Sequence, residues 1–139
     1  MDNVPSMFRW LFASPAAPGP GRCVLWWEAR RIPINLLIAV YGVLSLTIFF
    51  FAITSSGKLA PGDDAVEPIA IIVAPIVFNI CYTHGWLVEA PARGLFPDLS
   101  PRFGPRLLML GLGFSLCVIS LPAVFWAGYR VLQIMHVLR

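Results

Sequence analysis

The stretch NICYTHGW, residues 79–86, brings together five side chains whose chemistry could serve a function. They are an amide, a thiol, a phenol, a hydroxyl and an imidazole: Asn79, Cys81, Tyr82, Thr83 and His84. Thiolate and imidazole bind transition metals, and imidazole also binds haem iron. The amide, phenol and hydroxyl exchange hydrogen bonds and can line the path of a substrate or a proton. The question is whether this stretch forms a reactive site or joins neighbouring helices.

The helical period divides the five side chains between two faces. At about 100° per residue, Asn79, Tyr82 and Thr83 lie near one side of a helix, and the thiol and imidazole lie on roughly the opposite side. Polar groups in lipid must be paired. We therefore predict interhelical hydrogen bonds from the first face to polar side chains of the other apolar segments, including Asn35. A substrate or proton path along the same face is the alternative.

The second face offers too few ligands for a metal site on its own. Cys81 and His84 are spaced i, i+3, so one helical turn could supply two ligands. A third ligand would have to come from one of three residues near the same end of the segment: Cys23, Glu28 or Glu89. Haem held between His84 and His136 is excluded by the topology predicted below, which places the two histidines at opposite membrane surfaces. Cys81 and His84 are therefore weak ligand candidates, and we predict no metal and no cofactor.

Acid and base catalysis is the other chemistry to consider. Glu28, Glu89 and Arg93 could transfer protons, but they belong to segments at the membrane boundary, where charges are solvated or paired. The sequence contains no nucleophile with a base positioned beside it, no phosphate-binding glycine loop and no GxSxG. We predict no catalytic residue and conclude that the chain is not an enzyme.

The elements that carry these residues are three long apolar segments. The chain has 139 residues, of which 58% are hydrophobic and only 12% are charged, so it is too apolar for an ordinary soluble domain. A helix needs about 20 residues to cross the hydrocarbon core, and residues 33–54, 69–88 and 107–128 are long enough. The sequence predicts an all-α membrane protein in which residues 33–139 form a bundle of three transmembrane helices.

The flanking segments are predicted to lie at the membrane surface. Residues 1–32 form an interfacial N-terminal segment, in which the aromatic stretch at residues 7–12 lies against the headgroups. Tryptophan suits the headgroup region and arginine suits its phosphates. The predicted interfacial anchors are Trp26, Trp27, Glu28, Arg30, Arg31, Trp86 and Glu89. Polar residues recur at every third position from Arg130 to His136, which predicts an amphipathic C-terminal extension.

Prolines and small residues predict local features of the spans. We expect Pro33 in a first helical turn, a kink at Pro75, and a kink or an end at Pro122. The proline-rich residues 90–106 are expected to be irregular. Stripes of small residues on the first and third spans, including Gly42 and Gly113, predict close packing against another helix of this chain or of a partner.

The distribution of basic residues predicts the orientation. Seven of the ten lie in residues 1–32 or in the connection between the second and third spans. The positive-inside rule then places the N-terminus in the cytoplasm and the C-terminus outside. The arginines are neither dense nor interleaved with polar aromatics on a soluble face, so no nucleic-acid partner is expected.

Two motifs carry a resemblance. WWEARR, residues 26–31, and NICYTHGWLVE, residues 79–89, are similar to motifs of a family of small uncharacterised bacterial multi-spanning membrane proteins. In that family the position of His84 is usually apolar. The matching positions in the second motif are Asn79, Tyr82, Gly85, Trp86 and Glu89. The resemblance implies a membrane location and no assigned activity. We expect the chain to lie in a bacterial inner membrane.

The expected function is a structural or accessory role in the membrane. Three helices enclose little interior, so we expect self-association or association with other membrane subunits. A redox or haem-binding subunit, or an oligomeric channel or exporter, is the alternative.

Overall fold

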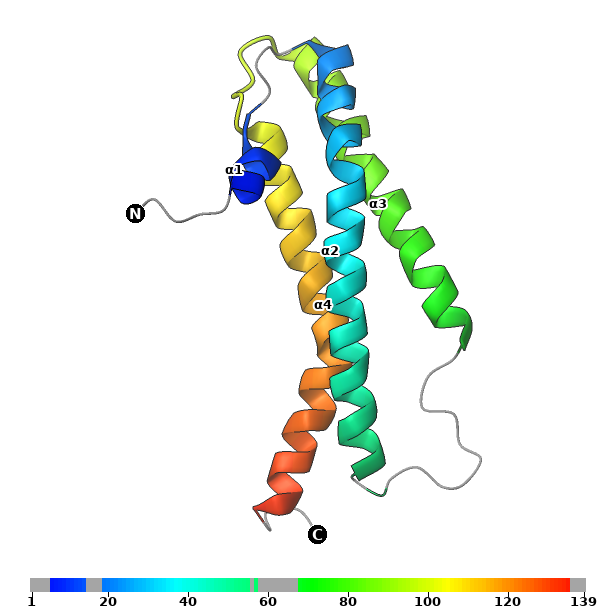
Figure 1. Cartoon of the computed structure of the whole chain (residues 1–139). Helices are drawn as coiled ribbons and strands as arrows, with labels where there is room; N and C mark the ends of the chain where they lie inside the picture. Colours follow the sequence, from blue (N-terminus) through cyan, green and yellow to red (C-terminus); the bar gives the residue numbers. More distant parts are fainter. Residues whose placement is uncertain (1–5, 15–18, 56, 58–67, 136–139) are drawn as a thin grey trace. The chain divides into compact units, whose positions relative to one another are not determined.

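The computed structural model describes residues 6–14, 19–55, 57 and 68–135. This part of the chain contains four helices and no strand: α1 (Ser6–Phe12), α2 (Pro20–Ser55), α3 (Pro68–Leu95) and α4 (Phe103–Ile134). Figure 1 shows their order along the chain. The predicted all-α fold is confirmed.

Three of the described helices are long and apolar enough to cross a membrane. The segments that meet this condition are Gly21–Ser55, Ile71–Leu95 and Phe103–Ile134. They are compatible with a small integral membrane protein that passes the membrane several times. Each helix is longer than the segment predicted from the sequence, because hydropathy locates only the apolar part of a helix.

The first long helix begins before the predicted position. α2 starts at Pro20, so Pro33 lies inside the helix and the prediction that it occupies the first turn is wrong. Buried side chains recur along the added segment, residues 20–32, at helical spacing: Cys23, Trp26, Trp27 and Arg30. This buried face stabilises the helix through packing. Such packing is not visible in hydropathy, which identifies only apolar stretches long enough to cross a membrane.

The prolines interrupt the helices less than the sequence suggested. α3 continues through Pro75 and Pro91 to Leu95, and α4 continues through Pro122 to Ile134. The prediction of an irregular segment over residues 90–106 is therefore too broad, and the non-helical connection covers residues 96–102. Pro105 lies in the first turn of α4, where a missing N–H breaks no helical hydrogen bond.

The C-terminal extension continues α4 to Ile134. Within it the Gln133 side-chain amide donates to the Tyr129 hydroxyl at 3.3 Å, and Arg130 donates to Gln133 at 3.4 Å. His136, the last residue of the predicted polar row, lies outside the described residues.

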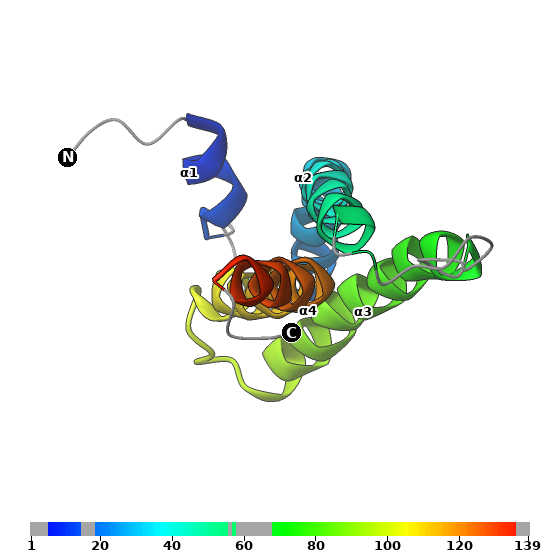
Figure 2. The same cartoon turned by 90° about the horizontal axis from the view of Figure 1, so that it is seen from below.

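The chain divides into two compact units. Unit 1 consists of Met1–Asn35 with Ile76–Phe114, and unit 2 consists of Leu36–Pro75 with Ser115–Arg139. Within unit 1, α1 lies crosswise to the first part of α2: it is seen nearly end-on in Figure 1 and lengthwise in Figure 2. α2, α3 and α4 each contribute residues to both units.

The core of unit 1 joins all four helices. It comprises Leu11, Cys23, Trp26, Trp27, Ile34, Tyr82 and Leu108. The Trp27 ring packs edge-on against the rings of Trp26 and Tyr82, with centroid distances of 5.5 and 5.2 Å. Gly85 faces the same ring so closely that a Cβ at this position would collide with it. This close approach brings α3 against α2.

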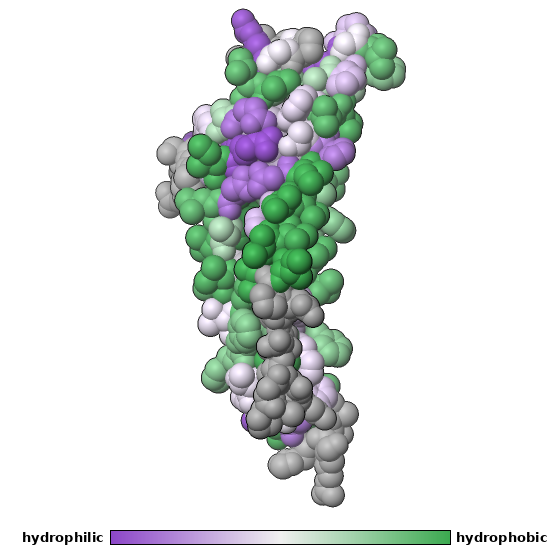
Figure 3. All heavy atoms as spheres, turned by 90° about the vertical axis from the view of Figure 1, so that its right-hand side faces the viewer, coloured by the Kyte–Doolittle hydropathy of each residue, from purple (hydrophilic) through white to green (hydrophobic). Residues whose placement is uncertain are grey.

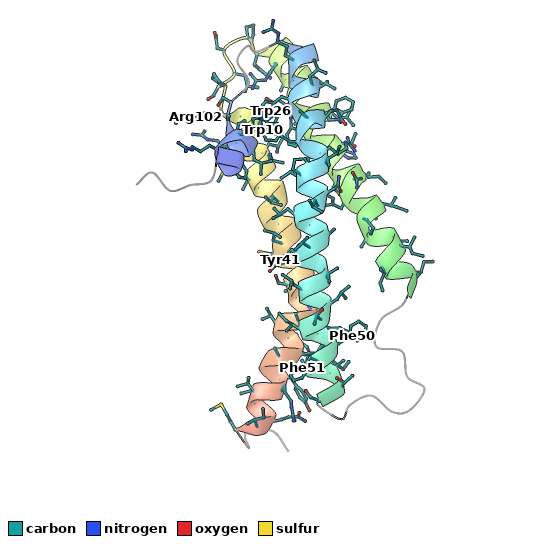
Figure 4. All side chains as sticks on the ribbon, in the orientation of Figure 1. Trp10, Trp26, Tyr41, Phe50, Phe51 and Arg102 are labelled. Carbon is teal, nitrogen blue, oxygen red and sulfur yellow. The ribbon has the colours of Figure 1, made fainter. Side chains whose placement is uncertain are left out.

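Unit 2 joins α2 and α4 through a smaller core and two polar contacts. Phe49, Ile53 and Ala123 are buried together. The hydroxyls of Tyr41 and Ser120 are 2.5 Å apart, and the Ser45 hydroxyl donates to the Ile119 carbonyl at 2.7 Å. Tyr41, and the exposed Phe50 and Phe51, are labelled in Figure 4. Most of the large apolar side chains on these helices are exposed. Figure 3 shows one face of the molecule, on which hydrophobic residues surround a hydrophilic patch in the upper half.

Candidate functional site

The most enclosed polar group of unit 1 is the carboxylate of Glu89 on α3, with 1% of the residue exposed. Its Oε1 accepts hydrogen bonds from Arg93 Nε at 2.8 Å and Nη2 at 2.5 Å. Its Oε2 accepts from Trp27 Nε1 of α2 at 2.7 Å. A Cβ added to Gly104, in the first turn of α4, would collide with the carboxylate. Glu89 therefore contacts α2 and α4 and holds them to α3. We call Glu89, Arg93, Trp27 and Gly104 the carboxylate centre.

The carboxylate centre is arranged to offset the cost of burying charge. Arg93 follows Glu89 by one helical turn, and their side chains are 2% and 1% exposed. Burial removes water from both charges, and hydrogen bonds to the remaining lone pairs and donors reduce this cost. The indole N–H of Trp27 supplies the bond to the second oxygen. The first turn of α4 adds its partial positive charge beside the carboxylate.

Two donors near this centre have no acceptor. Trp86 Nε1 and Arg93 Nη1 are buried and have no hydrogen-bond partner among the described residues. The thiol of Cys23 is 2% exposed and lies near the charges of Glu89 and Arg93. The centre is thus a packed junction in which both carboxylate oxygens are already bound within the chain.

A second polar cluster joins α2 to α3 nearer the surface of unit 1. Arg31 donates to Glu28 at 2.6 and 2.8 Å on its own helix, to Thr83 Oγ1 at 3.1 Å and to Asn79 Oδ1 at 3.4 Å on α3. Asn35 and Asn79 exchange amide hydrogen bonds of 2.8 and 3.1 Å. The cluster therefore links α2 to α3 through both charged and neutral hydrogen bonds.

Three of the residues predicted for interhelical contacts meet in this cluster: Asn35, Asn79 and Thr83. The fourth, Tyr82, also joins the helices, but its hydroxyl donates to the backbone carbonyl of Trp27 at 2.6 Å. Ser120 of α4 is bonded to Tyr41 in unit 2.

Arg30 forms a third polar contact, between α2 and α1. Its Nε and Nη2 donate to the carbonyls of Leu11 and Trp10 at 2.8 and 2.6 Å, in the last turn of α1. The guanidinium lies between the rings of Trp10 and Trp26, 4.4 and 4.0 Å from their centroids. Trp26 Nε1 donates to the Ala13 carbonyl at 2.8 Å. These contacts cap α1 and hold it against α2.

The prediction of interfacial anchors is wrong for four residues. Trp26, Trp27, Arg30 and Glu89 are buried in unit 1, so they do not face lipid headgroups. Tryptophan and arginine beside an apolar span have the same composition whether they face the membrane surface or pack inside the protein. Here α1 and the first turn of α4 provide intramolecular partners for them. Trp86 is half-buried against the core, whereas Glu28 and Arg31 retain 41% and 27% side-chain exposure.

The weak ligand candidates lie apart from the carboxylate centre. Cys81 and His84 are exposed on α3, and His84 Nδ1 lies 2.7 Å from the Ile80 carbonyl of its own helix. Among the residues described, no three His, Cys, Asp or Glu side chains gather where they could hold a metal ion.

Sequence reasoning missed the role of Gly104 and named Arg93 only as a possible proton-transfer group. The i, i+4 spacing of Glu89 and Arg93 is a local pattern that could have indicated their pairing. Nothing in the sequence near Gly104 indicates that a carboxylate from another helix lies against it.

No family model, no curated protein and no solved structure matches this chain.

Proposed function

We propose that this chain is a structural or accessory component of a bacterial inner membrane, working as an oligomer or as part of a larger membrane complex. The observation that supports the proposal is that the polar and the apolar side chains of these helices lie in different environments. Buried polar groups bind one another within the chain, and apolar groups of the same helices face outward.

The buried polar side chains form contacts between the helices of the chain. The Glu89 carboxylate binds Trp27 and Arg93, the amides of Asn35 and Asn79 bind each other, and Tyr41 binds Ser120. Such contacts stabilise helix association in lipid by about 0.6 to 2 kcal/mol each. Their geometry supports a role in holding the helices together.

The exposed apolar side chains form a surface suited to lipid or to other membrane helices. Ile72, Val124 and Phe125 are 65%, 67% and 68% exposed. A Cβ at Gly42 or Gly113 would meet nothing within 4 Å, so these two glycines do not serve close packing inside the chain. Small residues on an outward face permit the close approach of a partner helix. These two positions of the predicted packing stripes therefore fit an intermolecular contact.

The proposed orientation has the N-terminus and the connection between α3 and α4 in the cytoplasm. It is supported by the positive-inside rule, since residues 1–32 and 89–106 together carry seven of the ten basic residues.

The test is the mass of the protein after extraction in mild detergent, measured by light scattering with the detergent contribution subtracted. A protein mass well above the 15.3 kDa of one chain is expected, from further copies or from a co-purifying subunit. Gly42→Leu and Gly113→Leu should reduce this mass, whereas Leu110→Met, a volume-conserving change at an exposed site, should not. A clean monomer with no co-purifying chain would contradict the proposal.

A further inference from the structure

We propose that unit 1 carries a binding surface for anionic phospholipid headgroups, formed by four exposed arginines. They are Arg9 on α1, Arg22 near the start of α2, and Arg102 and Arg106 at the start of α4. We call them the arginine surface. The inference rests on the proposed membrane location, and it differs from the sequence prediction, which assigned the headgroup contact partly to the buried Arg30.

The fold places these arginines around one packed core. Arg9 is two residues from Leu11, Arg22 precedes Cys23, and Arg106 precedes the adjacent pair Leu107 and Leu108. All of these apolar neighbours pack in or against the core of unit 1. Arg102 lies one turn before Arg106, whose N–H donates to the Arg102 carbonyl at 3.1 Å. Figure 4 shows Arg102 at the level of Trp10 and Trp26.

Contacts within unit 1 fix the position of α1, and hence of Arg9. An isolated helix of seven residues is not stable in water. α1 is held by the two bonds from Arg30 to the carbonyls of Trp10 and Leu11, and by the stacking of Trp10 on the guanidinium. It lies crosswise to α2, so it runs along the membrane surface when α2 spans the bilayer (Figures 1 and 2).

The charge of unit 1 is not balanced within the described residues. None of the four exposed arginines makes an ion pair with another described residue. Of the described acidic residues of unit 1, Glu28 is bound to Arg31 and Glu89 is bound to Arg93, which leaves Asp98 in the connection. The arginine surface therefore carries an excess of positive charge that an anionic partner would neutralise.

Lipid phosphate fits this surface better than a free anion. The arginines are attached to helices with outward apolar surfaces, and Trp10, 44% exposed next to Arg9, suits the headgroup layer. Arg102 and Arg106 lie at the N-terminal end of α4, where the helix dipole repels cations and attracts phosphate. A guanidinium group can donate two parallel hydrogen bonds to two oxygens of one phosphate. A phospholipid places its phosphate at the surface while its acyl chains cover the apolar helices.

The test is native mass spectrometry of the full chain in detergent, with phosphatidylglycerol or phosphatidylcholine added. We expect preferential binding of phosphatidylglycerol that weakens with salt and is not displaced by inorganic phosphate. Each Arg→Gln change at the four positions should weaken binding roughly fivefold, since a basic residue near an anionic surface contributes about 1 kcal/mol. The matched control is Arg130→Gln, a half-exposed arginine of unit 2, which should change nothing.

Two results would overturn the inference. One is equal binding of the two lipids by the wild-type chain, and the other is unchanged binding after all four substitutions. Displacement by inorganic phosphate would assign the surface to a free anion instead. The single variants Arg9→Gln and Arg22→Gln keep the test decisive if the fourfold variant does not fold. The mass of the protein assembly, read in the same spectra, tests the proposed accessory function separately.

Discussion

Replacing Glu89 by glutamine should destabilise the protein strongly, because the change leaves a buried guanidinium without its counter-charge. Glu89→Gln preserves the size of the side chain. It removes the negative charge that accepts hydrogen bonds from Arg93 Nε and Nη2 and from Trp27 Nε1. The glutamine amide nitrogen cannot accept a hydrogen bond, so at least one of these donors loses its partner.

The expected loss follows from the burial of the pair. Removing one partner of a buried ion pair costs about 3 to 5 kcal/mol, because the other charge stays buried and uncompensated. The matched control is Glu28→Gln. Glu28 also pairs with an arginine on its own helix, at 2.6 Å, but with 41% side-chain exposure. Exposed ion pairs contribute about 0 to 1 kcal/mol. The loss in free energy of unfolding should therefore be several-fold larger for Glu89→Gln than for Glu28→Gln.

Unfolding in mixed micelles, followed by tryptophan fluorescence during titration with a denaturing detergent, measures the free energy of unfolding. A second probe is the labelling of Cys23, which is 2% exposed and lies near the charges of Glu89 and Arg93. In a background with Cys81→Ala and Cys117→Ala, a maleimide reacts only with this thiol. Glu89→Gln should accelerate labelling, and Glu28→Gln should not.

Adding Arg93→Met to Glu89→Gln should recover part of the loss, because the unpaired charge is removed. If Glu89→Gln is no more destabilising than Glu28→Gln, the buried ion pair does not hold the helices together and the structural account of the centre is refuted.

Three further predictions concern the packing between helices. Gly104→Ala should cost about 1 to 3 kcal/mol in the same titration, because its Cβ would collide with the carboxylate, whereas Gly94→Ala, whose Cβ meets nothing within 4 Å, should not destabilise. Asn35→Leu and Asn79→Leu should each destabilise, with a coupling energy of about 0.6 to 2 kcal/mol in a double-mutant cycle; additive losses would show that the amides are not coupled. Arg30→Lys should release α1 and expose it to trypsin, since lysine cannot reproduce the bidentate contact; unchanged cleavage would contradict this role.

The sequence predicted the features that depend on local period and on the cost of polarity in lipid. Those two principles gave the all-α fold and three spans. They also placed Asn79 and Thr83 on one helical face that needs partners, and the structure shows both side chains bonded to α2. A helical face follows from spacing alone, so it can be derived before any tertiary contact is known.

The features that escaped prediction depend on contacts between distant parts of the chain. Arg30 is buried because α1 folds back to offer the carbonyls of Trp10 and Leu11, about twenty residues earlier. Glu89 is buried because Trp27 and Gly104 approach it from two other helices. The amino-acid composition around each of these residues fits a membrane-surface anchor as well as a buried side chain. Only the three-dimensional arrangement distinguishes the membrane surface from the protein interior.

The connection between WWEARR and NICYTHGWLVE is one such arrangement. Trp27 of the first motif donates to Glu89 of the second, and Tyr82 donates back to the Trp27 carbonyl. The Trp27 ring occupies the space that Gly85 leaves open. Each stretch therefore supplies partners for the other within unit 1.

We propose that the outward faces of these helices serve assembly in the membrane, while the polar groups hold the chain together. Native mass spectrometry of protein released in detergent-free membrane particles tests it most directly, because the contacts between chains are preserved. We expect particles that contain more than one 15.3-kDa chain, or one chain with another subunit. Particles that contain single chains with lipid alone would contradict it.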